Sequence, residues 1–193
     1  MVDTSPYIRI VCEGFRTEPN YLNGWLRANN YVAANPAFKA KDNSPRGVVK
    51  EAKKVFKEAR HMKIPAEKIH VWAVFDRDGH PGIPEAINEA SECNIGYAFS
   101  NVCFEFWILL HYARITQPFT DCDEIIDTIK KYHDADYGKS NDHYDRLKDK
   151  TDAAIHNGKW LLETHWQYDD RPVWEKNPFS NVHKMLEDLK KIL

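Results

Sequence analysis

Two acidic residues, separated by one residue, follow a short apolar segment of the chain. Residues 71–75 read Val-Trp-Ala-Val-Phe, and Asp76 and Asp78 follow them. An apolar run of this length is typical of a strand buried on both faces. Because alternate side chains of an extended backbone leave the same face, the two carboxylates would lie together and repel each other. A hard divalent cation such as Mg²⁺ or Mn²⁺ would relieve that repulsion, so the pair predicts a metal site rather than a solvated turn.

Two further acids adjoin apolar segments. Glu13 directly follows residues 7–12, whose apolar and β-branched composition predicts a strand. Glu105 lies within residues 104–112, which are apolar nearly all round and therefore predict a buried helix. A buried carboxylate must be paired, hydrogen-bonded or metal-bound. The sequence leaves open whether Glu105 belongs to a metal site or only satisfies an arginine or helix-terminal amides.

The order of the expected elements predicts an α/β fold. Strands are expected at residues 7–12, 71–76 and 94–99, with a weaker extended segment at 31–38. Helices are expected from Pro19 to about residue 29 and at residues 48–59, 83–92 and 104–112. Strands that alternate with helices favour a mostly parallel sheet with helices on both faces.

After residue 114 the composition becomes polar and the strand patterns end. Helices are expected at residues 123–132, at 142–156 with a continuation past Gly158, and from Asn177-Pro178 onward. We expect residues 1–114 to form the α/β core and residues 115–193 a helical extension packed on it, as one compact domain.

The bulk composition limits the classes of function. The chain has 193 residues, a net charge of −2 and a pI near 6.5, so no overall basic field marks it as a protein that coats nucleic acid. One face of the helix at residues 48–59 is basic. We interpret it as a solvent-exposed face in preference to a surface that contacts nucleic acid. Its residues are Lys50, Lys53, Lys54, Lys57 and Arg60.

The cysteines favour a reducing compartment. Cys12, Cys93, Cys103 and Cys122 include no closely spaced pair, and no secretory segment opens the chain. Reduced cysteines in a cytoplasmic protein are therefore expected. No apolar run approaches the length of a membrane span, so no membrane association is expected.

Several motifs in combination resemble the RloB-like family of bacterial and archaeal proteins. The resemblance rests on Val11-Cys12-Glu13-Gly14 with Thr17-Glu18-Pro19-Asn20-Tyr21, on Val74-Phe75-Asp76-Arg77-Asp78, on Ser100-Asn101 with Phe104-Glu105, Trp107 and Leu109-Leu110-His111, and on Asn177-Pro178 with Val182-His183. The resemblance implies a Toprim-like (Rossmann-like) sheet, in which a Glu follows the first strand and an Asp-x-Asp a later one. Members are associated with restriction-modification loci and phage defence.

The acids and the resemblance together imply a nuclease that uses Mg²⁺ or Mn²⁺ to hydrolyse RNA, with tRNA as one candidate, or DNA in abortive-infection defence. The expected metal ligands are Glu13, Asp76 and Asp78, and Glu105 would complete the catalytic acids. The expected substrate-binding residues are Arg16, His80 and Lys139 for charge stabilisation, and Ser100 or Asn101 for a phosphate oxygen. Nucleic acid is the expected partner, and a defence-system protein and a second copy of the chain are further candidates.

Two other functions stay open at this point. A haloacid-dehalogenase-like phosphatase would use Asp76 as nucleophile and Asp78 as acid/base, although Gly79-His80 fits that motif poorly. A sensor or interaction module would bind a metal or nucleotide through the same acids without turnover. Trapping of a phospho-aspartate mimic would indicate the phosphatase, and cleavage of RNA or DNA the nuclease.

Overall fold

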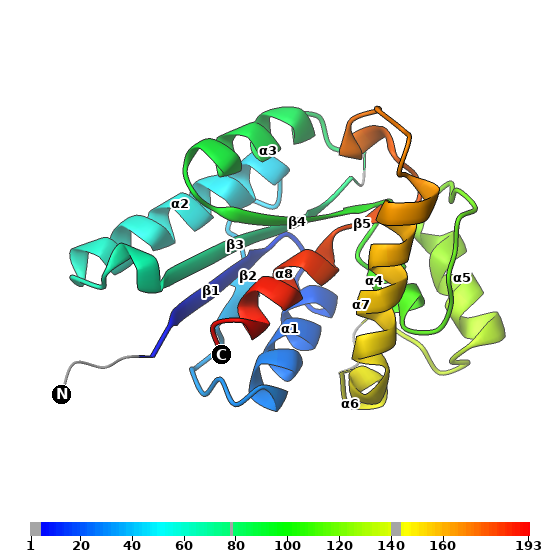
Figure 1. The fold of residues 1–193 in the computed structure, drawn as a ribbon, viewed down its shortest axis with the longest axis horizontal. Helices are drawn as coiled ribbons and strands as arrows, with labels where there is room; N and C mark the ends of the chain where they lie inside the picture. The colour runs from blue at the N-terminus through cyan, green and yellow to red at the C-terminus, as the bar shows by residue number, and fades with distance from the viewer. Residues whose placement is uncertain (1–4, 78, 140–143) are drawn as a thin grey trace.

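The computed structural model describes residues 5–77, 79–139 and 144–193, and it contains a five-stranded sheet with helices on both faces (Figure 1). The strand order is β2-β1-β3-β4-β5. The neighbours among β1 to β4 pair in parallel, and β5 runs antiparallel to β4. The predicted α/β class with a mostly parallel sheet is therefore confirmed.

The centre of the sheet comes from two apolar strands. β1 (Tyr7–Cys12) and β3 (Ile69–Asp76) pair in parallel, from Tyr7 opposite Ile69 to Cys12 opposite Val74. Most of their side chains are buried, as expected for strands covered on both faces. The strand β2 (Ala37–Lys39) lies beside β1, and β4 (Gly96–Asn101) lies beside β3. This register brings the carboxyl ends of β1, β3 and β4 to one edge.

Helices cover both faces of the sheet. α2 (Pro45–His61) and α3 (Ile83–Glu92) lie on one face, and α1 (Thr17–Ala28) and α8 (Val182–Lys190) lie on the other (Figure 1). Ser44 caps the start of α2, because its hydroxyl accepts a hydrogen bond from the Gly47 amide at 3.1 Å. Within the described ranges, no helix combines the length and apolar character needed to cross a bilayer.

The remaining helices gather near the carboxyl ends of the strands (Figure 1). They are α4 (Glu105–Leu110), α5 (Cys122–Tyr132), α6 (Tyr144–Leu147) and α7 (Thr151–Trp160), which continues as a π-helical turn (Leu161–His165). Short 3₁₀ turns occupy Ala66–Lys68, Lys148–Lys150 and Val173–Glu175. The predicted continuation past Gly158 is confirmed, and a Cβ there would lie only 2.8 Å from Nδ1 of the buried His183 ring. Glycine thus allows α7 and α8 to approach closely.

The prediction that the last helix starts at Asn177-Pro178 is wrong. Phe179–Ser180 instead forms β5, a strand that the sequence did not predict, and α8 begins only at Val182. The reason is tertiary, because β4 offers unpaired backbone groups at the edge of the sheet. Asn181 adds to this pairing by accepting a hydrogen bond from the Phe99 amide at 2.6 Å.

Candidate functional site

The carboxyl ends of β1 and β3 bring two acids into contact. Glu13 directly follows β1, and its amide donates to the Val74 carbonyl at 2.9 Å, which extends the pairing of the two strands. Its Oε2 accepts a hydrogen bond from the amide of Asp76, the last residue of β3, at 2.9 Å. The parallel order of the strands therefore places Glu13 beside Asp76, as the strand pattern led us to expect.

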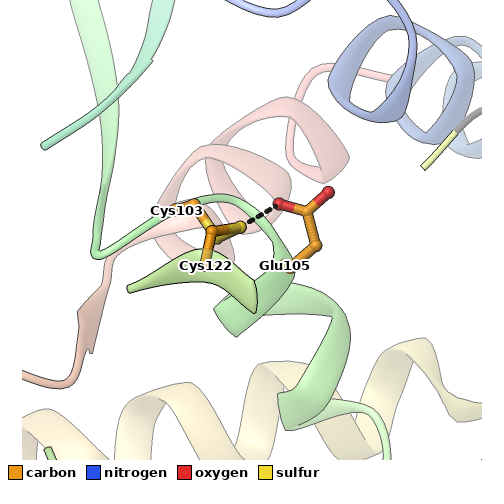
Figure 2. A group of neighbouring side chains, drawn as sticks. All are labelled: Cys103, Glu105 and Cys122. Atoms are coloured by element: carbon orange, nitrogen blue, oxygen red, sulfur yellow. Dashed lines mark hydrogen bonds between the residues drawn. A yellow bond between two sulfur atoms is a disulfide. The ribbon is translucent and has the colours of Figure 1, made fainter. Parts of the chain in front are cut away.

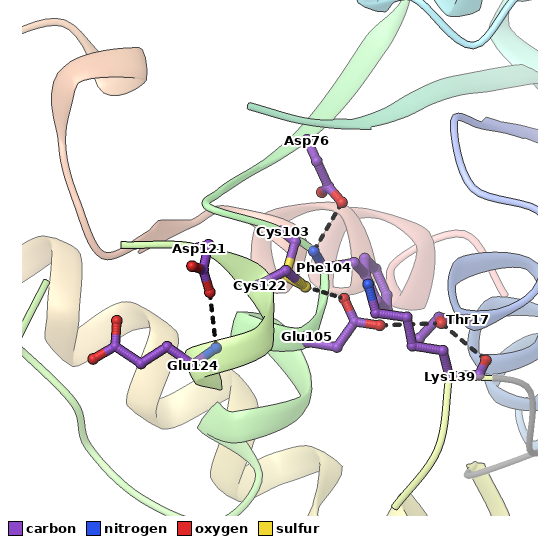
Figure 3. Close-up of a disulfide and its surroundings, with 9 residues drawn as sticks. All are labelled: Thr17, Asp76, Cys103, Phe104, Glu105, Asp121, Cys122, Glu124 and Lys139. Carbon is purple, nitrogen blue, oxygen red and sulfur yellow. Dashed lines mark hydrogen bonds between the residues drawn. A yellow bond between two sulfur atoms is a disulfide. The ribbon is translucent and has the colours of Figure 1, made fainter. Parts of the chain in front are cut away.

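Asp76 is held with one oxygen bound and the other buried. Its Oδ2 accepts a hydrogen bond from the Phe104 amide at 3.0 Å, whereas Oδ1 is buried with no partner among the described residues (Figure 3). Burial raises the pKa of Asp76 well above its ordinary value, and the negative charges of Glu18, Glu13 and Glu105 add to the rise. Without a cation, this environment shifts the carboxyl group toward its neutral form.

Glu18, on the first turn of α1, joins these acids. It is 5 % exposed, and its Oε1 accepts a hydrogen bond from the Gly14 amide at 2.9 Å. Burial raises its pKa to about 7, and the charges of Glu105 and Glu13 act in the same direction. A Cβ at position 14 would collide with the Glu18 carboxylate, so glycine is required for this approach.

The prediction from the sequence did not include Glu18 among the site residues. An acid in the first turn of a helix is commonly explained by the helix dipole, and that explanation needs no site. The sequence feature that could have indicated Glu18 is its position. Glu18 follows Gly14 and Thr17, shortly after a strand that is already followed by an acid. Only the direction of α1 shows that the side chain points inward.

Glu105 approaches the other acids from α4. It is 3 % exposed, and its Oε1 lies 3.2 Å from the hydroxyl of Thr17 on α1 (Figure 3). The same hydroxyl lies 3.1 Å from the Lys139 carbonyl oxygen, so its single proton serves one of these two acceptors at a time. Thr17 therefore connects α1, α4 and the loop that carries Lys139.

An aromatic cluster fixes α1 against α4. The Tyr21 ring of α1 makes edge-to-face contacts with Phe104 and Trp107, with ring centroids 5.8 and 6.2 Å apart. All three side chains are almost fully buried. This packing holds Glu18 and Glu105 on the same side of the strand ends.

The four acids open onto one cleft of about 360 Å³, which we call the acid cleft. Its acidic lining consists of Glu13, Glu18, Asp76 and Glu105. Arg16 and Lys139 also line it, so two of the predicted charge-stabilising residues lie beside the acids.

The sequence profile of the RloB-like protein family matches residues 8–189, nearly the whole chain. The chain belongs to this family. No curated protein and no solved structure matches it significantly. The matched range contains every acid of the cleft, so this RloB-like chain carries the site within the part that defines the family.

The structure separates the other predicted site residues of this RloB-like chain. His80 lies at the site, with its Nε2 3.2 Å from Oε1 of Glu13. Ser100 and Asn101 are not among the residues that line the acid cleft, and their expected role in holding a phosphate oxygen stays a prediction. Ser100 Oγ instead lies 3.2 Å from Ser180 Oγ, and Asn101 Nδ2 donates to the Lys176 carbonyl at 2.7 Å. Both side chains thus hold the C-terminal segment against β4.

Asp78 lies outside the described residues, so its role as a metal ligand stays a prediction. His111 packs in the interior. Its Nδ1 lies 3.0 Å from the Trp107 carbonyl oxygen, which assigns the proton to Nδ1 and leaves Nε2 to accept from the Tyr21 hydroxyl at 2.9 Å. Burial lowers the pKa of His111 to about 4, so it stays neutral at physiological pH.

The expectation that all cysteines of this RloB-like chain are reduced is wrong for one pair in this structure. Cys103 and Cys122 form a disulfide that joins the segment before α4 to the first residue of α5. No local pattern predicts this bond, because residues 19 positions apart meet only through the packing of α4 on α5. Cys12 and Cys93 are free thiols.

The acid cleft fits a hard divalent cation by its donor chemistry. It offers buried carboxylates with raised pKa values and the partnerless Oδ1 of Asp76. Among the residues that the structure describes, no three of these acids bring one oxygen each within 4.8 Å of one another. Three of the acids therefore do not converge on one ion position. Mg²⁺ is suited to such a site, because it commonly takes one or two carboxylates and keeps several waters. Asp76 and Glu13 are the best-placed ligands because their contact joins the two strand ends.

Proposed function

We propose that this RloB-like protein is a Mg²⁺- or Mn²⁺-dependent nuclease that hydrolyses phosphodiester bonds of RNA, with tRNA as one candidate, or of DNA in antiviral defence. The observation that carries the proposal is the meeting of three buried acids (Glu13, Glu18 and Glu105) and the half-buried Asp76 with Arg16 and Lys139 around one cleft. Folding gathers these like charges at a cost that an external cation would offset. The placement of Glu13 and Asp76 after neighbouring strands also supports a Toprim-like core.

The residues of the acid cleft have distinct tasks in this proposal. Asp76 and Glu13 would hold the cation. A bound cation would neutralise the charge of the phosphate and lower the pKa of a water molecule. Glu18 is suited to proton transfer, because its pKa of about 7 lets it hold or release a proton near neutral pH. Arg16 and Lys139 would bind the phosphate and stabilise the charge that develops on it.

A second surface of the molecule supports nucleic acid as the substrate. A hollow of about 840 Å³ runs along α2 and is lined by Lys50, Lys53, Lys54 and Lys57, which we call the lysine face. Asp42 and Ser44 line this hollow, whereas Asn43 lines the acid cleft. The loop at residues 42–44 therefore borders both the hollow and the acid cleft. A nucleic-acid strand bound along α2 would lead to the acids.

Half of the lysine face is neutralised within the protein. Lys53 forms an ion pair with Glu89 at 2.6 Å, and Lys54 lies within 4 Å of Glu51 and Glu58. Lys50 and Lys57 form no hydrogen bond or ion pair with the residues that the structure describes. These two lysines are the ones available to phosphate groups.

The proposal is tested with a panel of tRNA, single-stranded RNA and single- and double-stranded DNA, each with Mg²⁺, Mn²⁺ or chelator. We expect metal-dependent cleavage by the wild-type protein. Asp76→Asn should lower the rate at least about a hundredfold, since loss of one electrostatic stabiliser costs roughly 10²–10³ in rate. The matched control is Asp170→Asn, which makes the same change at an exposed position.

The apo stability of the Asp76→Asn protein should stay level or rise, because the substitution relieves repulsion among the acids. Full activity in this variant would refute the site assignment. Metal binding by the wild-type protein without cleavage of any nucleic acid would instead indicate the non-catalytic module, and a trapped phospho-aspartate mimic the phosphatase.

A further inference from the structure

We infer that reduced Cys103 and Cys122 bind a divalent cation that accepts thiolate ligands, such as Zn²⁺, together with Glu105. This inference is independent of the proposed nuclease activity. Cys103, Glu105 and Cys122 each present one donor atom, and these atoms all lie within 4.8 Å of one another (Figure 2). In the described part of the chain, no other three His, Cys, Asp or Glu side chains do so.

A close contact joins a sulfur and a carboxylate oxygen of this trio. Sγ of Cys122 lies 3.2 Å from Oε2 of Glu105 (Figure 2). In the disulfide this sulfur carries no hydrogen and cannot donate to the carboxylate. A Cys122 thiol would donate its proton to Glu105, and a cation would be bound by both.

The donor set matches the coordination chemistry of zinc. Thiolates and a carboxylate are common zinc ligands, and three protein ligands leave one tetrahedral position for water. That position can face solvent, because Cys103, Glu105 and Cys122 all line the acid cleft. Two thiolates and one carboxylate also bring enough negative charge to compensate for a buried divalent ion.

The chemistry requires a dithiol reductant. The dithiol transfers two electrons and two protons to the Cys103–Cys122 disulfide, which becomes two thiols while the reductant becomes a disulfide. Binding of Zn²⁺ then releases the two thiol protons to solvent. Glu105 is shared by both sites, so zinc would engage a carboxylate that otherwise faces Glu13, Glu18 and Asp76.

The test uses the full-length chain in two redox states. One sample is reduced with dithiothreitol and desalted without oxygen, and the other is left oxidised. Zn²⁺ affinity is measured by competition with a chromophoric chelator, and Co²⁺ serves as a probe because thiolate ligation gives it a near-ultraviolet charge-transfer band. We expect one equivalent of Zn²⁺ and the Co²⁺ band in the reduced protein, and neither in the oxidised protein.

Variants then assign the ligands. Cys122→Ser should weaken Zn²⁺ binding of the reduced protein more than about a hundredfold, because loss of a partner to a ligand alone costs roughly 10- to 100-fold. Cys93→Ser, which alters the half-buried free thiol, should bind Zn²⁺ normally. Asp76→Asn should retain the Co²⁺ charge-transfer band, because that band arises from the thiolates, and this separates the site from the proposed nuclease metal.

Equal Zn²⁺ binding by the oxidised and reduced proteins, or a reduced protein without the Co²⁺ charge-transfer band, would overturn the inference. Retained binding in Cys122→Ser would overturn it as well. If that variant does not fold, the comparison of the two redox states of the wild-type protein decides alone. None of these measurements uses a nucleic acid, so a failed cleavage panel leaves the inference intact.

Discussion

The acid cleft and the lysine face carry opposite charges, and they differ in burial and in how their charges are paired. In the cleft, Glu18 and Glu105 are 5 % and 3 % exposed, and the carboxylates face one another. On the lysine face, the side chains of Lys53 and Lys54 are 29 % and 55 % exposed and pair with acids of the same fold. The protein thus pairs part of its surface charge with opposite charges, whereas it gathers carboxylates of like charge in the acid cleft.

This difference shows which surface is the stronger evidence of function. Exposed lysines with nearby acids cost the fold almost nothing, and such pairs contribute little to stability. Buried like charges cost much more, so their presence needs an explanation outside the folding of the chain. The acid cleft is therefore the stronger evidence of function, and the lysine face is a proposed additional surface for binding nucleic acid.

The largest expected effect concerns pH and the metal-free acid cleft. Glu18 keeps its proton up to about pH 7 in the folded protein, against an ordinary pKa of 4.5. In this window the folded state binds more protons than the unfolded state, so its stability falls as pH rises from about 4.5 to about 7. A pKa shift of this size corresponds to at most about 3 kcal/mol, and Asp76 adds an effect of the same sign.

Denaturant unfolding in chelator at pH 5 and pH 7.5 measures this loss. Glu18→Gln should reduce it, whereas Glu163→Gln, the same change at an exposed position, should not. Addition of Mg²⁺ or Mn²⁺ at pH 7.5 should restore stability to the wild-type protein. Equal pH dependence in both variants would mean that the cleft carries no uncompensated charge and would remove the contrast with the lysine face.

Glu105→Gln is expected to have a smaller effect and sharpens the boundary of the acid cleft. We expect Mn²⁺ affinity to fall roughly 10- to 100-fold in calorimetry, with the apo melting temperature little changed. The reason is that glutamine keeps the shape of the side chain but cannot supply a carboxylate. Normal Mn²⁺ binding with a clearly lower melting temperature would instead make Glu105 a structural acid and reduce the site to Glu13, Glu18, Asp76 and Asp78.

The smallest effect is expected on the lysine face. Reversal of Lys50 and Lys57 to glutamate should weaken RNA or DNA binding and lower the slope of log affinity against log salt by about 2, since each phosphate contact contributes about one. Fluorescence anisotropy at several salt concentrations measures this slope. The control is the double reversal of Lys190 and Lys191, two exposed lysines at the end of α8. An unchanged slope in the first variant would return the lysine face to a solvated surface.

The sequence by itself determined the elements whose pattern is local. The strand at 7–12 and the helix at 83–92 occupy the predicted residues, because apolar spacing and turn residues are read within a few positions. The contact between Glu13 and Asp76 also followed from the sequence. Glu13 directly follows one apolar strand and Asp76 ends the other, and the carboxyl ends of parallel strands meet at one edge of the sheet.

Only the tertiary structure decided the features that depend on distant partners. Glu18 points into the cleft because α1 packs on α4 through Tyr21 and Trp107, and no local pattern encodes that packing. β5 forms because the edge of β4 lacks a partner, and a two-residue strand has no periodicity to detect. Cys103 meets Cys122 through the packing of α4 on α5. In each case the deciding energy comes from contacts between segments far apart in the chain, which residue types and spacing do not record.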